Sequence, residues 1–248
     1  MSNVLTIDQG NSSTKVCVFD DDVMIASLRF AALSIEELFA IVEQYNVSNA
    51  IYCSVARMDI RMIESLRNSL NGNLIVLTHE TPLPIKINYS TPHTLGFDRI
   101  AAVVGAATRY AESAYLVVDA GTAITLDMFA ENRFLGGNIS PGISLRFKSL
   151  NSYTEKLPIV EHIGSELVDF GTDTKTAILS GVVNGVVSEI LVTFQKVKNM
   201  YHSPKLILTG GDAEYIKSCM PQMESEILVD ENLVAYGLKR IFNYNENI

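Results

Sequence analysis

Apolar residues in the N-terminal third of the chain fall into short runs separated by polar turns, and these runs predict strands that alternate with helices. The predicted strands are Val4–Asp8, Thr14–Asp20, Val23–Phe30, Asn49–Ser54 and Leu74–Thr78. Helices are predicted over Ile35–Tyr45 and Asp59–Leu70. The first begins at Ser34, and Glu37 three residues later completes a capping box. Strands in alternation with helices indicate an α/β domain.

The same alternation continues after an irregular stretch. Residues 79–96 contain Pro82, Pro84 and Pro92, so we expect them to be irregular or to lie at a sheet edge. The strands predicted beyond this stretch are Tyr115–Asp119, Ala123–Phe129, Arg133–Leu135, Lys205–Thr209 and Ile227–Val229. The helices predicted there are Phe97–Tyr110, Thr174–Tyr201, Asp212–Ser218 and Glu231–Phe242.

A repeated pattern links the two halves of the chain. Residues 4–11 and 116–122 each form an apolar run that ends Asp-x-Gly and enters small polar residues, and a further apolar strand follows each copy. A repeat on this scale predicts two similar domains, residues 1–112 and 113–248, which face each other across a cleft. The alternative is that Asp-x-Gly at a strand end is only common turn chemistry.

Composition narrows the classes of function. Apolar residues make up 48% of the chain and charged residues 19%, which is typical of a globular protein. A net charge of −9 argues against a general nucleic-acid binder. Cys17, Cys53 and Cys219 are widely spaced, as expected of reduced cysteines in a cytosolic protein without a zinc site. With no basic apolar leader and no long uncharged apolar run, we expect a cytoplasmic protein outside the membrane.

The first candidate for phosphate chemistry is DQGNSSTK, the segment Asp8–Lys15 after the first predicted strand. Its glycine lets the backbone approach a ligand. Donors for phosphate oxygens come from backbone amides and side chains of Gln9, Gly10, Asn11, Ser12, Ser13 and Thr14. Asp8 can hold Mg²⁺ through water, whereas Lys15 either adds positive charge or is a plain surface lysine. The segment is not a P-loop, because the chain has neither GxxxxGK[ST] nor GxGxxG.

The second candidate is DAGTAITLD at Asp119–Asp127, which would supply another phosphate loop from the other domain. Two Asp-x-Gly turns provide the carboxylates, the hydrogen-bond donors and the positioning that phosphoryl transfer needs.

A third candidate is GFDR at Gly96–Arg99, which stands at a predicted helix start. In a functional interpretation, Asp98 accepts a proton from a substrate hydroxyl and Arg99 holds an anion. In a structural interpretation, Asp98 caps the helix and Arg99 makes a surface ion pair.

Two glycine-rich segments remain. GGNISPG at Gly136–Gly142 predicts a rigid loop that approaches a ligand or another backbone, or else a plain connection to a helix. LTGGDA at Leu208–Ala213 predicts a shelf for adenosine or phosphate, or else a simple strand–helix turn. The four histidines are scattered along the chain and are assigned no role.

The order and spacing of these motifs resemble those of the type III pantothenate kinases, members of the acetate and sugar kinase/Hsp70/actin superfamily. The resemblance extends over nearly the whole chain and includes Thr154–Pro158 after GGNISPG. It implies an α/β fold of two duplicated actin/ribonuclease H-like domains with mixed sheets. The chain departs from the family pattern at Gln9, where an apolar residue is usual, and at Ser12, where threonine is common.

The resemblance also implies a role for each matching residue. Asp8 to Lys15 and Thr122 correspond to ATP contacts, and Asp98 corresponds to the catalytic base. Asp119 corresponds to the ligand of a monovalent cation, K⁺ or NH₄⁺, and Mg²⁺ accompanies ATP. The residues that correspond to pantothenate contacts are Tyr89, Gly96, Phe97, Asp98, Arg99 and Thr174.

The implied activity is phosphorylation of pantothenate to 4′-phosphopantothenate by a homodimer, the first step of coenzyme A synthesis. The long helix Thr174–Tyr201 could supply part of the dimer contact. Two alternatives stay open: a phosphotransferase of the same superfamily with another small substrate, and a catalytically silent homologue that acts as a regulator.

Overall fold

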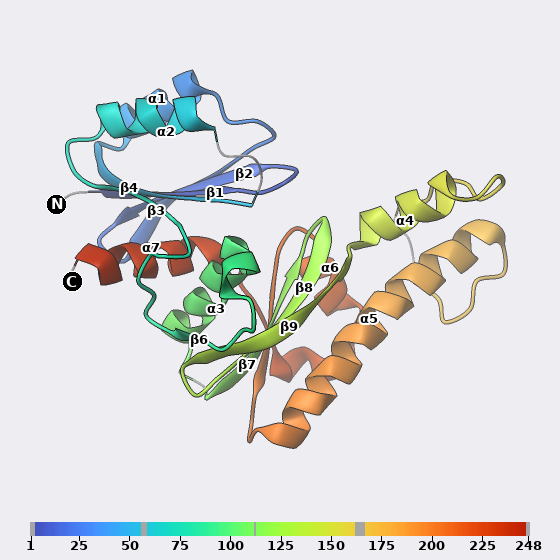
Figure 1. Cartoon of the computed structure of the whole chain (residues 1–248). Coiled ribbons are helices and arrows are strands. Elements are labelled where there is room, and N and C mark those ends of the chain that lie inside the picture. Colours follow the sequence, from blue (N-terminus) through green and yellow to red (C-terminus); the bar gives the residue numbers. More distant parts are fainter. Residues whose placement is uncertain (1–2, 56–58, 112, 162–166, 247–248) are drawn as a thin grey trace. The chain divides into compact units, whose positions relative to one another are not determined.

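The computed structural model describes residues 3–55, 59–111, 113–161 and 167–246 (Figure 1). Its contacts divide the chain into two compact units. Unit 1 consists of residues 1–111, 132–134 and 232–248, and unit 2 of residues 112–131 and 135–231. The division therefore differs from the expected one at 112, because the C-terminal segment and a short piece near residue 133 belong to the first unit.

Unit 1 contains a five-stranded mixed sheet with the order β3-β2-β1-β4-β5. Its strands are β1 (Asn3–Gln9), β2 (Thr14–Asp20), β3 (Val23–Phe30), β4 (Val47–Ser54) and β5 (Leu74–Val76). The strand β1 pairs antiparallel with β2 and parallel with β4, so the carboxyl ends of β1 and β4 meet at one edge of the sheet.

Two helices, α1 (Ile35–Gln44) and α2 (Ile60–Ser69), cover one side of this sheet (Figure 1). The predicted capping box of α1 is confirmed: the Ser34 hydroxyl accepts the Glu37 N–H at 3.2 Å, and the Glu37 carboxylate accepts the Ser34 N–H at 2.8 Å. At α2, the Asp59 carboxylate caps the helix by accepting two backbone N–H groups. Both caps satisfy donors that a helix start otherwise leaves unpaired.

The opposite side of the sheet is covered by α7 (Leu233–Glu246), which packs along α3 (Phe97–Arg109). The two helix backbones come together at glycines. A Cβ atom at Gly237 would overlap the carbonyl oxygen of Ala101, and one at Gly105 would overlap that of Leu233. This packing places the C-terminal helix in unit 1, although it is the last element of the chain.

The irregular stretch predicted at 79–96 contains two short elements: β6 (Lys86–Ile87) and a 3₁₀ turn at Pro92–Thr94. The strand β6 pairs in parallel with Arg133 and Phe134, the first residues of β9 (Arg133–Pro141). The strand β6 lies at the edge of its sheet, as the edge-like alternative expected, but sequence patterning did not give its bounds because two residues are too few to show a period.

Unit 2 contains strands in the order β9-β8-β7-β10-β11. Besides β9, these are β7 (Ala114–Ala120), β8 (Ala123–Ala130), β10 (Lys205–Thr209) and β11 (Ile227–Val229). The prediction of a loop over Gly136–Gly142 is wrong, because β9 extends to Pro141. Gly136 accommodates the extension with a φ of 130°, a conformation that side-chain-bearing residues rarely adopt.

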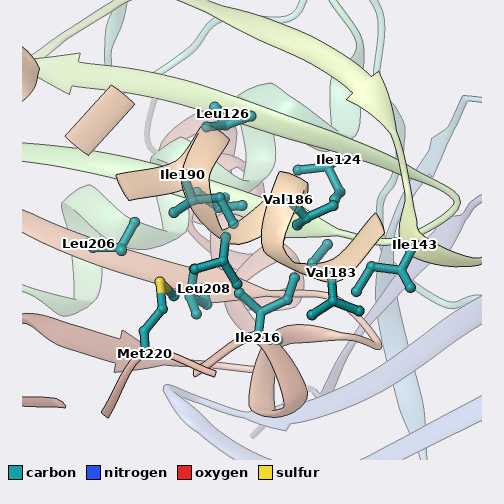
Figure 2. Close-up of a cluster of buried hydrophobic side chains, with 14 of the residues drawn as sticks. Ile124, Leu126, Ile143, Val183, Val186, Ile190, Leu206, Leu208, Ile216 and Met220 are labelled. Atoms are coloured by element: carbon teal, nitrogen blue, oxygen red, sulfur yellow. The ribbon is translucent and has the colours of Figure 1, made fainter. Parts of the chain in front are cut away.

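The helices of unit 2 are α4 (Ile143–Ser152), α5 (Thr174–Met200) and α6 (Ala213–Ser218), and a 3₁₀ helix spans Pro221–Glu226. Figure 2 shows Val183, Val186 and Ile190 of α5 packed against side chains of β8 and β10. Within the described part of the chain, α5 is the one helix long and apolar enough to cross a membrane. Its buried face forms the core of unit 2, which is the ordinary reason for such a composition in a core helix.

The two units share one strand plan. The order β3-β2-β1-β4-β5 in unit 1 corresponds to β9-β8-β7-β10-β11 in unit 2, and both begin with an antiparallel pair joined by a tight turn. The internal repeat predicted from the two Asp-x-Gly segments is therefore present in the topology.

The glycine contact between α3 and α7 predicts a loss of stability in Gly237→Ala. The added methyl group meets backbone rather than a flexible side chain, so the helices must separate, at a cost of roughly 1–3 kcal/mol. Urea unfolding measures this change. Gly181→Ala on the exposed side of α5 is the matched control; no atom lies within 4 Å of its Cβ, and we expect a gain of about 0.5–1 kcal/mol. Equal effects of the two changes would contradict the close contact.

Candidate active site

The predicted phosphate segment Asp8–Lys15 spans the end of β1, a tight turn and the start of β2. The Gly10 N–H donates to the Ser13 carbonyl at 3.0 Å and closes the turn. A Cβ at Gly10 would lie 3.2 Å from that same carbonyl oxygen, so glycine suits this narrow turn. Asn11 and Ser12 are exposed at its tip, whereas Thr14 is buried in β2. The turn therefore presents polar groups to solvent from a fixed base.

Asp8 and Asp98 are brought together around one buried thiol. Burial raises the pKa of Cys53 well above its usual range, and the carboxylates of Asp8 and Asp98 raise it further. Cys53 is the neighbour of Asp8 in the parallel β1–β4 ladder. Two of the predicted acids, separated by most of unit 1 in sequence, thus lie near the same edge of its sheet.

Asp98 lies in the first turn of α3 but does not cap the helix. The N-cap is Gly96, and Asp98 Oδ1 accepts the backbone N–H of Arg99 at 2.8 Å. A Cβ at Gly96 would lie 2.5 Å from that oxygen, so glycine leaves room for the carboxylate. Burial raises the pKa of Asp98, and the N–H and guanidinium of Arg99 oppose the rise. A carboxylate with a raised pKa is suited to accept a proton.

Arg99 is 5% exposed, so the surface-pair interpretation is wrong for this residue. Its guanidinium carbon lies 6.0 Å from the ring centre of Tyr89 and 5.7 Å from that of Phe134. The two rings meet edge to face, 6.0 Å apart. Arg99 and Tyr89, both predicted substrate contacts, therefore lie together. No sequence motif marked Phe134, which reaches the site through the β6–β9 pairing.

Phe97 contacts a histidine to which the sequence assigned no role. The rings of Phe97 and His79 are tilted, with centres 4.5 Å apart. His79 is thus a structural neighbour of the GFDR segment.

In unit 2, Asp119 and Thr122 lie where three backbone segments meet. The Asp212 N–H donates to the Ala120 carbonyl at 3.0 Å, and the Gly142 N–H donates to the Thr122 carbonyl at 3.0 Å. Gly210 has a φ of 90°, and a Cβ there would lie 2.5 Å from Asp119 Oδ1. The two glycine-rich segments found in the sequence thus support the second Asp-x-Gly turn through their backbones.

The surroundings of Asp119 fit a hard cation. Thr125 stands directly opposite Asp119 in the β7–β8 ladder, a spacing that brings facing side chains close. Thr125 is 8% exposed, and its buried hydroxyl oxygen has no hydrogen-bond partner in the described part of the protein. Oxygen is the donor type that hard cations prefer. The sequence did not single out Thr125.

No group of three or more His, Cys, Asp or Glu side chains that could hold a metal occurs among the described residues. Mg²⁺ commonly binds through one or two carboxylates, water and substrate phosphates. Asp8 fits that mode.

Thr174 is the first residue of α5 and is exposed, with Asp173 capping the helix. It belongs to unit 2, whereas Tyr89 and Arg99 belong to unit 1. Its predicted contact with the same substrate stays a prediction.

Duplicated mixed sheets with an Asp-x-Gly turn after the first strand of each define a protein of the actin-like fold. Among solved structures of this fold, the ROK hexokinase of Thermus thermophilus has a TM-score of 0.51 at 12% identity, covering 99% of this chain and all of the other. The family model of type III pantothenate kinases matches residues 4–196. The chain belongs to the type III pantothenate kinase family.

Curated relatives agree over nearly the full length. The type III pantothenate kinase of Bacteroides fragilis is 38% identical over 242 residues, which covers 97% of this chain and 98% of the relative. That of Phocaeicola vulgatus is 39% identical over 248 residues, which covers 98% and 99%. A Campylobacter jejuni structure described as a Baf family transcriptional activator has a TM-score of 0.63 at 26% identity, covering 98% of this chain and all of the other.

The conformation of Gly210 predicts a selective loss of nucleotide binding in Gly210→Ala. The new residue is held at a strained φ and crowds Asp119, at a cost of about 1–3 kcal/mol, so we expect Mg·ATP affinity to fall about tenfold or more. Gly211→Ala is the matched control, because no atom lies within 4 Å of its Cβ. Calorimetric titration with Mg·ATP compares the two, and similar affinities would contradict a role for Gly210 in shaping the turn.

Proposed function

We propose that this protein transfers the γ-phosphate of ATP to the primary hydroxyl of pantothenate and forms 4′-phosphopantothenate, the entry step of coenzyme A synthesis. The observation that carries the proposal is Asp98: a partly buried carboxylate with a raised pKa, beside the buried guanidinium of Arg99, within the GFDR segment of a family member. A proton acceptor next to a fixed cation is the chemistry that an alcohol bearing a carboxylate requires.

ATP is bound through polar groups on both Asp-x-Gly turns. The exposed Gly10–Ser13 turn and its flanking residues Asp8, Gln9, Thr14 and Lys15 serve the phosphates in unit 1, and Thr122 serves them in unit 2. Asp8 holds Mg²⁺ through water. The ion, when bound, neutralises charge on the phosphate oxygens.

Pantothenate is held by residues around α3. The Arg99 guanidinium pairs with the substrate carboxylate, and the Tyr89 ring near it contacts the substrate. Gly96 and Phe97 border the acceptor hydroxyl. Thr174, at the start of α5 in unit 2, is assigned a hydroxyl contact with pantothenate on the family resemblance. The Tyr89 and Phe134 rings support the assignment of Arg99, because both lie within cation–π distance of the guanidinium.

The reaction needs one proton acceptor and one charged leaving group. The Asp98 carboxylate takes the proton of the primary hydroxyl as its oxygen bonds to the γ-phosphorus. The bond to the β-phosphate bridging oxygen breaks, and ADP leaves. General-base assistance of this kind is typically worth about 10²–10⁴-fold.

The protein is further proposed to work as a cytoplasmic homodimer with a monovalent cation, K⁺ or NH₄⁺, at Asp119. The unpartnered hydroxyl of Thr125 opposite Asp119 supports the cation. Exposed apolar side chains on the long helix, Val192 and Met200, support a contact with a second copy. A net charge of −9 disfavours nucleic acid as a partner.

Pantothenate-dependent release of ADP from Mg·ATP is the expected activity, and it should require K⁺ or NH₄⁺ and fall sharply with Na⁺ alone. A coupled ADP assay with each salt at equal ionic strength measures it. Turnover only with another small alcohol would assign a different substrate. A folded protein without turnover on any of them would instead be a silent regulator, a role that the retained Asp8, Asp98 and Asp119 disfavour.

Replacement of Asp98 by Asn separates catalysis from stability. We expect kcat to fall about 10²–10⁴-fold. Wild-type kcat should rise with pH through a pKa above that of an ordinary aspartate, and this rise should vanish in Asp98→Asn. A carboxyl whose pKa is raised in the folded state stabilises the fold below its unfolded pKa and loses this as pH rises through the folded pKa.

At neutral pH, Asp98→Asn should therefore unfold at a temperature no lower than wild type. The exposed Asp22→Asn is the matched control and should keep wild-type kcat. An Asp98→Asn enzyme with wild-type kcat and pH profile would refute the assignment of the base.

A further inference from the structure

Gln9 occupies an unusual place for a polar side chain. It ends β1 immediately before the Gly10–Ser13 turn. Because successive strand residues point to opposite faces, its side chain lies on the face opposite to Asp8. The residues on that face of β1, Leu5 and Ile7, belong to the core beneath α1 and α2. An amide at the end of an apolar column requires hydrogen-bond partners.

The amide oxygen of Gln9 accepts two hydrogen bonds from β4. One comes from the Tyr52 hydroxyl, and the other from the Ser54 hydroxyl at 2.9 Å. Tyr52 is 1% exposed and Ser54 is 9% exposed, so both bonds are shielded from solvent. Burial raises the pKa of Tyr52, and the backbone of Asp59, the N-cap of α2, opposes the rise. Tyr52 therefore lies between Gln9 and the start of α2.

The backbone of Gln9 is held as firmly as its side chain. Its carbonyl accepts the Val55 N–H at 3.1 Å, and it pairs with Thr14 in β2 and with Ser54 in β4. The next residue, Gly10, closes the turn through Ser13. Both the main chain and the side chain thus fix the direction in which the turn leaves the sheet.

We propose that Gln9, Tyr52 and Ser54 form a positioning network that orients the Gly10–Ser13 turn and thereby sets the affinity for the phosphates of ATP. The inference rests on the proposed nucleotide role of that turn. Gln9, grouped above with the residues that serve the phosphates, acts through the turn that it holds, because its amide oxygen is bonded to Tyr52 and Ser54. A displacement of about 1 Å in groups that position a substrate can cost about 10²-fold. The network lies on the face of the sheet away from Asp8, so its loss leaves the carboxylates near Cys53 in place.

The test is a set of variants titrated with Mg·ATP in the full-length protein without pantothenate. Gln9→Leu should weaken binding about tenfold or more, because it removes the acceptor of a buried hydroxyl. Tyr52→Phe should weaken it about three- to tenfold. Both changes remove the hydrogen bond between Tyr52 and Gln9. The double variant should therefore lose less affinity for Mg·ATP than the two single losses multiplied together. In steady-state assays the loss should appear as a larger rise in the KM for ATP than in the KM for pantothenate.

The control is Gln44→Leu, the same chemical change at an exposed position in the last turn of α1, which should bind Mg·ATP as wild type does. Unchanged ATP affinity in Gln9→Leu with a lower unfolding temperature would make the network purely structural and overturn the proposal. Changes in kcat and in the KM for pantothenate as large as the change in ATP affinity would also overturn it.

Failure of the two proposals can be told apart. If the wild-type protein binds Mg·ATP but does not phosphorylate pantothenate, the proposed substrate fails while the ATP titrations still decide the network. If the wild-type protein does not bind Mg·ATP, the network has no ligand to position and is refuted.

Discussion

The contact on which the first unit depends is the approach of two helix backbones at Gly105 and Gly237. Without side chains at these positions, α3 and α7 touch main chain to main chain. Asp98 and Arg99 stand in the first turn of α3, so the depth of this contact determines where they lie relative to the sheet. Interior packing transmits small displacements rather than absorbing them. The acid that we assign as the base is therefore positioned by glycines that never meet a substrate.

The acids Asp98 and Asp119 lie among different kinds of compensating neighbour. Arg99 is enclosed by two aromatic rings and adjoins Asp98, whose carboxylate would otherwise be harder to ionise. Asp119 instead lies among backbone amides and carbonyls that glycines bring close. Side chains thus form the surroundings of Asp98 in unit 1, whereas main-chain groups form those of Asp119 in unit 2, although the two units share one strand order.

Local features of the fold could be predicted from the sequence, and long-range ones could not. The capping box at Ser34 and the repeated Asp-x-Gly turns depend on residues a few positions apart, so patterning found them. Gly136 suggested a loop because glycine favours turns, but pairing within the sheet holds it in a strand. Phe134 joins Arg99 only through β6. The partners of Gln9, Tyr52 and Ser54, lie on β4, and no pattern in the sequence around them indicates a bond to Gln9.

Unit 1 is built from the beginning and the end of the chain, and this has a consequence for how the protein is made. The ribosome releases every residue of unit 2 before it releases α7. Until α7 emerges, the side of the first sheet that α7 covers stays bare, and α3 lacks its glycine partner. The half of the protein that is synthesised first is therefore the last to complete its core, and a nascent chain truncated before residue 232 retains both Asp-x-Gly turns without the packing that positions Asp98.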